Sequence, residues 1–266
     1  MRNISLTIGV YLLLPSLLLL AIFVLPLVAL CWRLEWHQLF NLLSSAQVYS
    51  AMRISLLSSS MTAIITILLG TPFAYLLSQW QSRWKWWVEL LIDLPVVLPP
   101  SAAGLLLLIA FGRKGLLSPV LNSFDVRLSF TFAALVIAQL FVAAPLYVRI
   151  ARASFANLDR QWVEAAKVEG ANEWQLFRWV FVPLLLPLLA NGVLLTWARA
   201  IGEFGATLLF AGNLQGRTQT LPMAIYLSFE SNFQQALALS FFLLMISALL
   251  LFFARRLEHW QVAGLR

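Results

Sequence analysis

The sequence predicts an all-α integral membrane protein with six transmembrane helices, and two observations support that prediction. Apolar residues make up 61% of the 266 residues, and charged residues only 11%. Several apolar stretches also exceed the ~20 residues that a helix needs to cross a hydrocarbon layer of ~30 Å. Backbone groups inside lipid must be paired within their own segment, so these stretches are expected to be helical. The predicted spans are residues 8–32, 51–80, 88–111, 129–157, 173–207 and 235–256.

The first predicted span is expected to lie at the edge of the protein. We predict a single transmembrane domain over residues 1–266, in which residues 1–47 form a peripheral helix and loop and residues 48–260 form the core. The first apolar stretch is longer than that of a secretion signal, which predicts an uncleaved helix. The single cysteine, Cys31, excludes an internal disulfide and any cysteine-based metal cluster.

The second predicted span begins with hydroxyl side chains and ends in an aromatic, basic turn. The hydroxyl groups can hydrogen-bond to helix backbones and belong to Ser55, Ser58, Ser59, Ser60 and Thr62. The turn reads QWQSRWKWW, and tryptophans beside basic residues are typical of the boundary between lipid and water. A surface for nucleic acid is the alternative interpretation, which the membrane spans on either side disfavour.

The third predicted span contains three prolines within six residues, Pro95, Pro99 and Pro100. Prolines remove backbone N–H donors, so the helix must break or bend inside the membrane. Irregular backbone is tolerated there only where protein or a water-filled cavity covers it. Pro99, Pro100 and the adjacent Ser101 are therefore the first candidates for lining a path through the membrane. The alternative is a kink that serves packing alone.

The distribution of basic residues predicts how the spans are oriented. Of the 18 Lys and Arg residues, eleven fall in the N-terminus, the even-numbered loops and the C-terminal tail, and seven in or beside the odd-numbered loops. An excess of basic residues marks the cytoplasmic side, so both termini are predicted to be cytoplasmic. These loops account for most of the net charge of +7, and no nucleic-acid partner is needed to explain it.

A polar break, Asp159 to Pro183, separates the fourth and fifth predicted spans. Asp159 is expected to cap a short helix over residues 159–170, Gly170 to supply a left-handed turn, and Asn172 to cap the next helix. One face of the short helix is predicted to carry Trp162, Ala165, Ala166 and Glu169. A flat face of small residues suits docking into a groove on another protein.

The fifth predicted span carries two charges near its end. Arg199 and Glu203 stand four residues apart and share a helix face. Charges inside a membrane are costly unless they are paired or hydrated. Gly202 and Gly205 allow another helix to approach closely. Two interpretations stay open, a structural ion pair or polar groups that face the path. The loop that follows, residues 212–232, is expected to be an outer surface with few apolar residues.

Within the polar break, Glu164, Ala165 and Ala166, followed by Gly170 and Pro183, resemble the EAA loop of ABC importer permeases. The resemblance implies a cytoplasmic coupling helix that sits in a cleft of the ATP-hydrolysing subunit. The alternative is an ordinary loop between two membrane helices.

Several segments resemble molybdate importer permeases, within a likeness that spans about residues 50–256: 94–100, 111–115, 202–207, 210–213, 216–222 and 225–226. Sulfate and thiosulfate permeases are similar, but they usually have Tyr at the position of Phe204 and Ser at that of Ala206. The resemblance therefore implies import of an oxyanion, molybdate or its mimic tungstate, with sulfate or thiosulfate as the alternative.

The resemblance further implies a type I ABC importer in a prokaryotic plasma membrane. Two copies of this chain would join two cytoplasmic ATP-binding subunits, which hold ATP and Mg²⁺, and an extracytoplasmic oxyanion-binding protein that docks on the outer surface. Transport would proceed by alternating access along a path expected to include Pro99, Pro100, Ser101, Arg199, Gly202, Glu203, Gly205 and Thr207. A tetrahedral dianion needs hydrogen-bond donors, and the expected donors are Ser101, Arg199 and Thr207.

Motifs of enzymes are absent from the sequence. It contains no phosphate-binding loop of the G-x-x-x-x-G-K-[ST] type, no zinc-protease motif and no paired catalytic carboxylates, so we expect neither catalysis nor a bound cofactor or metal. A self-sufficient channel or secondary transporter is the alternative from another class. It predicts inverted repeats and embedded acidic residues that bind a driving ion, and neither pattern is visible.

Overall fold

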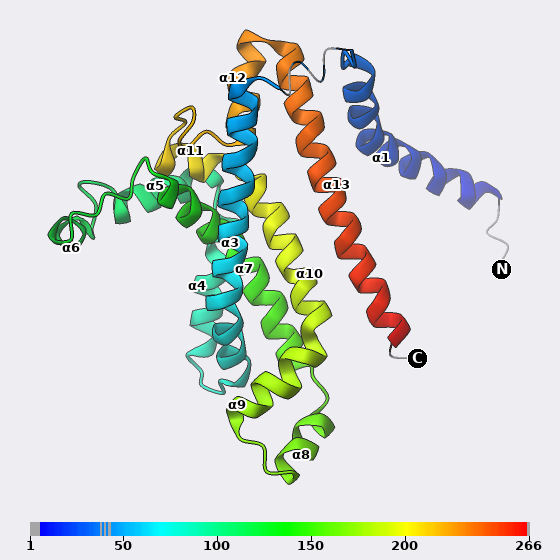
Figure 1. The fold of residues 1–266 in the computed structure, drawn as a ribbon. Coiled ribbons are helices and arrows are strands. Elements are labelled where there is room, and N and C mark those ends of the chain that lie inside the picture. Colours follow the sequence, from blue (N-terminus) through cyan, green and yellow to red (C-terminus); the bar gives the residue numbers. More distant parts are fainter. Residues whose placement is uncertain (1–5, 38, 40, 42–43, 265–266) are drawn as a thin grey trace.

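The computed structural model describes residues 6–37, 39, 41 and 44–264. Within these ranges every regular element is a helix, which confirms the predicted fold class (Figure 1). Five of the described helices are long and apolar enough to cross a membrane, and a bent pair adds a sixth span if it is counted as one. Each of the six predicted spans therefore has a counterpart in the structure.

Five long helices form the frame, and shorter helices connect them. The long helices are α1 (Leu6–Arg33), α3 (Ala46–Gln79), α7 (Phe132–Ala156), α10 (Val182–Ile201) and α13 (Phe233–Gly264). The shorter elements are α4 (Lys85–Val97), α5 (Pro100–Phe111), α6 (Ser118–Ser123), α8 (Arg160–Val168), α9 (Glu173–Gln175), the π-helix η1 (Leu176–Phe181), α11 (Gly205–Ala211) and α12 (Leu221–Ser231).

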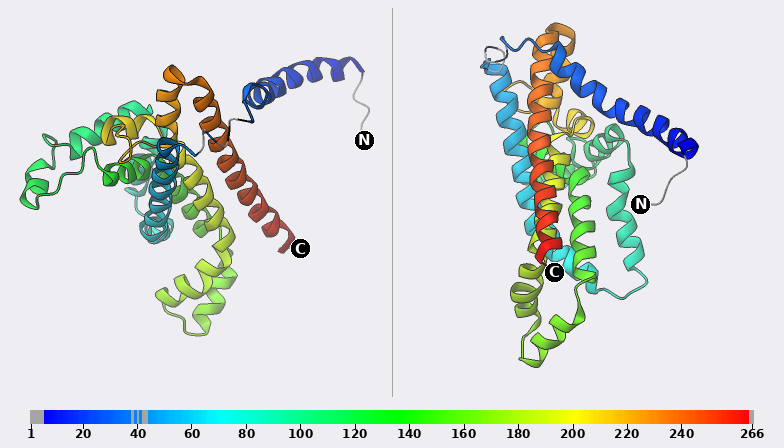
Figure 2. Two further views of the ribbon diagram at one scale, coloured as in Figure 1. Left: turned by 45° about the horizontal axis from the view of Figure 1, so that its top comes forward. Right: turned by 90° about the vertical axis from the view of Figure 1, so that its right-hand side faces the viewer.

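Helices α3, α7 and α10 pack together as the centre of the bundle, and α13 packs against α10 and α12 (Figures 1 and 2). Hydroxyl caps fix where two of these helices begin. The Val48 N–H donates to Ser45 Oγ at 3.4 Å, and the Ala134 N–H donates to Thr131 Oγ1 at 3.2 Å. Each cap satisfies one of the N–H groups that have no partner in the first helical turn.

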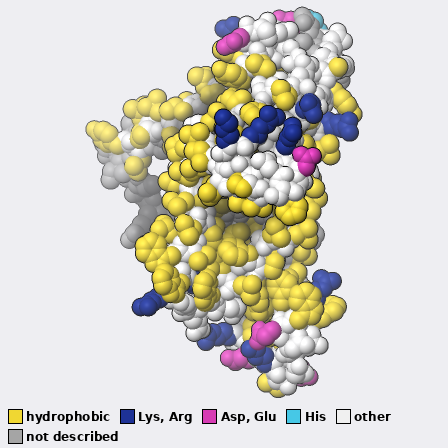
Figure 3. Space-filling model, turned by 90° about the vertical axis from the view of Figure 1, so that its left-hand side faces the viewer, with side chains coloured by type: hydrophobic (Ala, Val, Ile, Leu, Met, Phe, Trp, Pro, Cys, Tyr) yellow, Lys and Arg dark blue, Asp and Glu magenta, His cyan; other side chains and the backbone are white. Residues whose placement is uncertain are grey.

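Buried apolar side chains gather in three clusters along the described bundle. One lies between α5, α7 and α11, a second between α3, α7, η1 and α10, and a third between α3, α12 and α13. Around them the surface carries a broad apolar band, which suits contact with lipid (Figure 3). Lys and Arg side chains gather above this band, and charges of both signs lie near the lower tip.

Helix α1 lies at the edge of the structure. Its described stretch Tyr11–Arg33 has no buried residue in its most apolar part, and α1 packs against α13 near its end (Figure 2). The predicted peripheral segment, residues 1–47, also includes residues 1–5, 38, 40 and 42–43, which lie outside the described residues.

Two predictions near the fifth span were wrong, the end of its helix and the absence of a helix from the loop that follows. Helix α10 ends at Ile201 rather than at residue 207, because Gly202 leaves helical geometry and α11 begins afresh at Gly205. The following loop was expected to contain few apolar residues, but it contains α12. Leu221 and Ala224 bury one face of α12 against α3 and α13, and Met223 packs into the first cluster, which stabilises a helix that was not predicted.

Candidate functional site

The short helix α8 forms as the sequence predicts and projects beyond the bundle at the end opposite α12 (Figure 1). The Gln161 N–H donates to the Asp159 carboxylate at 3.0 Å, which caps the helix start. Gly170 has φ +84°, a left-handed conformation that glycine adopts without steric cost. Asn172 and Gln175 then form a reciprocal capping box with two hydrogen bonds of 2.9 Å.

The predicted common face of α8 is divided in the structure. Ala166 turns inward with Val163 and packs against the second buried cluster, whereas Trp162, Ala165 and Glu169 are exposed. Ala166 therefore anchors α8 to its own chain. Val168 is 86% exposed, so two large apolar side chains, Trp162 and Val168, stand free on the projecting helix. Glu164 is also exposed.

A polar link and an aromatic cluster join α8 to the bundle. Glu173 pairs with Lys167 of α8 at 3.3 Å, and the Tyr75 hydroxyl of α3 donates to the same carboxylate at 3.3 Å. The Tyr75 ring lies 5.6 Å from Phe155 of α7 and about as close to Phe177 and Phe181 of η1. Two long helices and the start of the fifth span thus meet directly above α8.

The π-helix η1 connects this cluster to α10. The Val182 N–H donates to the Phe177 carbonyl, a bond that reaches back five residues instead of four. Pro183, the next residue, has no N–H to continue this pattern and lies in the first turn of α10. Pro183 of the EAA-like pattern therefore marks where the wide helix returns to α-helical geometry.

The prediction of a broken third span is confirmed. Helices α4 and α5 meet at a bend of 117°, with Leu98 and Pro99 in extended conformations between them. The Leu98 N–H still closes α4 on Leu94, and the Ala103 N–H opens α5 on Pro99. The first turn of α5 begins with Pro100 and exposes Ser101.

Two glycines allow α5 and α11 to pack backbone against backbone. A Cβ added at Gly205 would lie 2.7 Å from Pro100 Cβ, and one added at Gly104 would lie 2.8 Å from the Ala206 carbonyl. The structure thus brings Pro100, Ser101 and Gly205 of the predicted path together, although they are about a hundred positions apart in the chain. Gly202 is exposed, and the nearest atoms to a Cβ placed on it belong to Ala198 and Arg199 of its own helix.

Arg199 and Glu203 form the ion pair that their spacing predicts, with Arg199 Nη1 2.6 Å from Glu203 Oε2. Glu203 is only 2% exposed, and its other oxygen accepts the Ala206 N–H at 2.9 Å. The carboxylate therefore fixes both the end of α10 and the start of α11, which favours the structural interpretation. The Arg199 side chain remains 39% exposed.

Thr207 was expected to be a donor to the oxyanion, but its position argues against that role. It is fully buried, and its hydroxyl donates to the carbonyl groups of Glu203 and Phe204 at 3.2 and 3.0 Å. Short local bonds of this kind occupy the donor within α11.

A buried polar network between α3, α7 and α10 was only half foreseen. Gln139 donates to Ser58 at 3.1 Å and accepts from Thr62 at 3.0 Å, and the Trp197 indole donates to Ser59 at 2.7 Å. The hydroxyl residues of α3 were predicted to bond to helix backbones, and Ser58 and Ser59 do so within α3. Their side-chain partners on α7 and α10 were not predicted. The signal was Gln139 itself, the one amide in the apolar stretch of residues 132–148.

No cluster of three or more His, Cys, Asp or Glu side chains capable of holding a metal occurs in the part of the chain that the structure describes. The site instead has three parts. Helix α8 projects from one end of the bundle, the span formed by α4 and α5 is bent, and α5 packs tightly against α11.

Comparisons with known proteins point in one direction. Residues 67–266 match the family described as "Binding-protein-dependent transport system inner membrane component". The molybdenum transport system permease protein ModB of Mycobacterium tuberculosis is 36% identical over 236 residues, which cover 89% of this chain and 89% of ModB. The sulfate transport system permease protein CysT of Escherichia coli is 33% identical over 258 residues, which cover 96% of this chain and 92% of CysT.

The fold also resembles that of a solved transporter. The crystal structure of a bacterial ABC transporter involved in the import of the acidic polysaccharide alginate contains a chain with a TM-score of 0.75. The two chains share 16% sequence identity, and the match covers 94% of each.

Proposed function

Because the chain belongs to the family of binding-protein-dependent transport system inner membrane components, we propose that it carries molybdate or tungstate across the membrane by alternating access. It is a multi-pass permease subunit of an ABC importer of the molybdate and sulfate type, and it has no catalytic activity of its own. Membership of this family excludes the alternative of a self-sufficient channel or secondary transporter.

The choice of molybdate rests on the relatives and on the start of α11. ModB is the more similar of the two permeases by identity, and Phe204 and Ala206 depart from the sulfate pattern. CysT matches more of the chain, so sulfate or thiosulfate remains the second candidate. All these substrates are tetrahedral dianions of one chemical class.

The bent span supplies donors suited to such an anion. The Ser101 hydroxyl lies in the first turn of α5, at the positive end of that helix, which favours negative charge. The half-exposed guanidinium of Arg199 adds a positive charge. In this proposal Pro99, Pro100, Gly202 and Gly205 shape the path, and buried Glu203 and Thr207 hold α10 and α11 in place.

The projecting helix supplies the contact with the motor. We propose that Glu164, Ala165 and exposed Trp162 and Val168 of α8 dock into a cytoplasmic ATP-binding subunit, which holds ATP and Mg²⁺. Two copies of this chain would bind two such subunits, and ATP binding would draw the two α8 helices together and open the path outward. Hydrolysis then returns the path to the inward-open state, a population shift driven by the partner's ligands.

Basic residues support an orientation with α8 in the cytoplasm. Eleven of the 18 Lys and Arg residues fall in the N-terminus, the loops on the α8 side and the C-terminal tail, and an excess of basic residues marks the cytoplasmic side. In this orientation both termini are cytoplasmic, and residues 212–232 face outward, where the oxyanion-binding protein docks. A C-terminal reporter that is active only in the cytoplasm is expected to be active, and one that works only outside is expected to be silent.

ATPase activity in lipid vesicles tests the substrate. The chain is purified with its ATP-binding subunit and binding protein, and ATP hydrolysis is measured with molybdate, tungstate or sulfate. Stimulation by molybdate and tungstate but not sulfate is expected. Stimulation by sulfate alone would keep the importer and replace the substrate.

Charge reversal at Glu164 tests the coupling role of α8. Glu164→Lys is expected to lower ATP-driven uptake about tenfold or more, because it places a cation on the docking face without removing any buried contact. Lys114→Glu, a charge reversal at another exposed residue that lies outside α8 and outside residues 212–232, is the control and is expected to have little effect. Normal uptake by Glu164→Lys in a fully assembled complex would contradict the assignment.

A further inference from the structure

Helix α4 is held to the rest of the chain by little apolar packing. Pro95 is the one buried residue among its 13 residues, all of which the structure describes. Its principal neighbour is α7. Large side chains along α4 point away from the bundle, and Val97 at its end is 81% exposed. Ile92 packs against the second buried cluster, and polar contacts add to this limited apolar attachment of α4 to α7.

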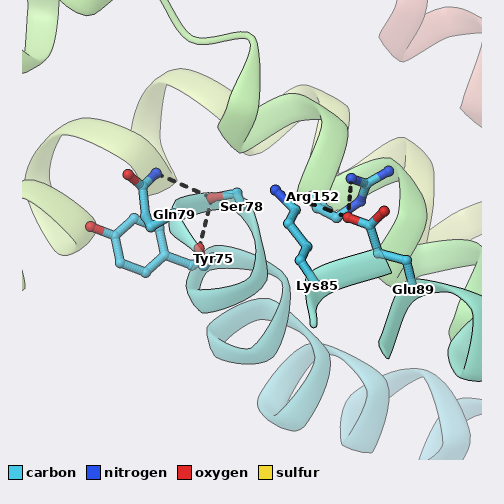
Figure 4. A network of polar contacts seen from close by, with 6 residues as sticks. All are labelled: Tyr75, Ser78, Gln79, Lys85, Glu89 and Arg152. Carbon is cyan, nitrogen blue, oxygen red and sulfur yellow. Dashed lines mark hydrogen bonds and ion pairs between the residues drawn. The ribbon is translucent and has the colours of Figure 1, made fainter. Parts of the chain in front are cut away.

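Two ion pairs lie where the helices meet. Arg152 Nη1 of α7 is 2.6 Å from Glu89 Oε1 of α4, and Arg149 Nη2 is 2.9 Å from Asp93 Oδ1. Arg149 Nε approaches the same Asp93 oxygen at 3.3 Å. Figure 4 shows the guanidinium of Arg152 directed at Glu89 from the neighbouring helix, with Lys85 on the other side of the carboxylate at 4.0 Å.

The spacing of these residues makes the two pairs a single ladder. Glu89 and Asp93 are four residues apart on α4, and Arg149 and Arg152 are three apart on α7, so each helix presents its two charges on one face. We call this set of four residues the α4–α7 ladder. Both rungs cross between the same two helices, which restrains both sliding and twisting of α4.

The surroundings make the Glu89–Arg152 rung stronger than an exposed surface pair, whereas the Asp93–Arg149 rung is itself largely exposed. Leu77, Ile92 and Val148 line the same small recess as the four charges. The Glu89 and Arg152 side chains are 26% and 30% exposed, and those of Asp93 and Arg149 are 40% and 50% exposed. Removing one partner would leave a charge beside apolar groups near the membrane, which is costly, whereas isolated exposed pairs contribute little.

The connections of the two helices give the ladder a mechanical role. Helix α7 ends at Ala156, and α8 begins at Arg160, so a displacement of α8 acts on α7 through three residues. Helix α4 continues through Leu98 and Pro99 into α5, whose first residue abuts Gly205. The ladder is therefore the direct polar link between the projecting helix and the bend.

We propose that Glu89, Asp93, Arg149 and Arg152 are positioning residues for transport, clamping α4 to α7 so that the two helices move as one lever. The lever carries the displacement of α8 to Pro99, Pro100 and Ser101 at the bend. This inference rests on the proposed transport function and adds to it the route by which the motor reaches the path.

Charge reversal in pairs tests the ladder in the assembled importer in vesicles, with molybdate uptake and ATP hydrolysis measured together. Glu89→Arg and Arg152→Glu are each expected to lower the uptake per ATP hydrolysed about tenfold while hydrolysis continues. The double variant restores the pair with its charges exchanged and is expected to recover most of the coupling. Unchanged coupling in assembled single variants, or no recovery in an assembled double variant, would overturn the proposal.

A covalent link gives a second, independent measurement, which also decides the matter if the reversed variants fail to assemble. Glu89→Cys and Arg152→Cys are combined in a Cys31→Ser background and joined by a short bifunctional thiol reagent. The double-cysteine variant is expected to lose uptake before cross-linking, because it lacks the ion pair. If α4 and α7 move together, cross-linking is expected to restore that uptake. A cross-linked importer that hydrolyses ATP without uptake would mean that the helices must separate, and the lever would be wrong.

The unsubstituted importer separates the two levels of the proposal. If it takes up sulfate rather than molybdate, the same variants are assayed with sulfate, and the ladder is tested unchanged. If it takes up no oxyanion at all, the proposed transport function is wrong, and the role of the ladder in transport is wrong with it.

Discussion

At the scale of single residues, close approach between backbones decides which glycines matter. Gly202 and Gly205 were both predicted to allow tight packing, and the structure distinguishes them. The nearest atoms to a Cβ at Gly202 lie 3.6 Å away, whereas at Gly205 the gap to Pro100 is 2.7 Å. The tight contact is therefore specific to Gly205, which holds α11 against the bend.

Substitution of these two glycines by alanine provides a matched test. Gly205→Ala is expected to destabilise the protein by about 1–3 kcal/mol, because α5 and α11 must separate to admit the methyl group. Gly202→Ala has room for the same group and is expected to leave stability nearly unchanged. The thermal unfolding midpoint in detergent measures both, and equal midpoints would contradict the packing described here.

Local spacing predicted residue contacts well, and distant partners could not be predicted. The cap at Asp159, the turn at Gly170 and the pair of Arg199 with Glu203 each depend on residues within a few positions. The second bond of Glu203, to the Ala206 N–H, depends on the helix ending at Gly202. The bonds of Gln139 to α3 join residues about 80 positions apart. A single sequence does not show which residues of two distant helices lie opposite each other.

At the scale of elements, the π-helix η1 joins the projecting helix to the membrane. Its wider turn directs Phe177 and Phe181 toward Tyr75 and Phe155, which come from other helices. The sequence predicts a helix here, but not a wider one, because its geometry depends on aromatic rings that arrive from α3 and α7. Helix α12 was missed for a related reason, since its stability comes from burial between α3 and α13.

Two aromatic residues of η1, two positions apart, test how the element is held. Phe181 is 4% exposed, and Phe181→Ala is expected to cost roughly 3–5 kcal/mol through the cavity that it leaves. Trp179 is 71% exposed, and Trp179→Ala is expected to cost much less. Unfolding midpoints in detergent are the measurement; a smaller loss for Phe181→Ala than for Trp179→Ala would show that the cluster does not anchor η1.

At the scale of the whole molecule, the number of spans and their approximate limits followed from composition, but their arrangement did not. Apolar stretches predicted six crossings, and prolines predicted the break in the third. The bend of 117° and the pairing of α5 with α11 arise from packing between segments far apart in the chain. Assembly with a second copy and with ATP-binding subunits remains a proposal from family membership.

Replacement of α1 tests the division of the chain into a peripheral segment and a core. Residues 6–33 are exchanged for an unrelated apolar helix of equal length, which keeps the number of crossings. The unfolding midpoint of the chain is expected to change little, because the described part of α1 contributes no buried residue to the core. A large drop in the midpoint would show that α1 belongs to the core. The substitution Tyr147→Ala, at a fully buried site of α7, shows how large a drop a core change causes.

The 117° bend also has a consequence for biosynthesis. When the ribosome has delivered α4 and α5, the broken backbone at Leu98 and Pro99 has no protein cover on the side where α11 will lie. That cover, residues 205–211, is translated about a hundred residues later. The third crossing is therefore completed only near the end of synthesis, and a chain that stops before α11 exposes an open bend to lipid.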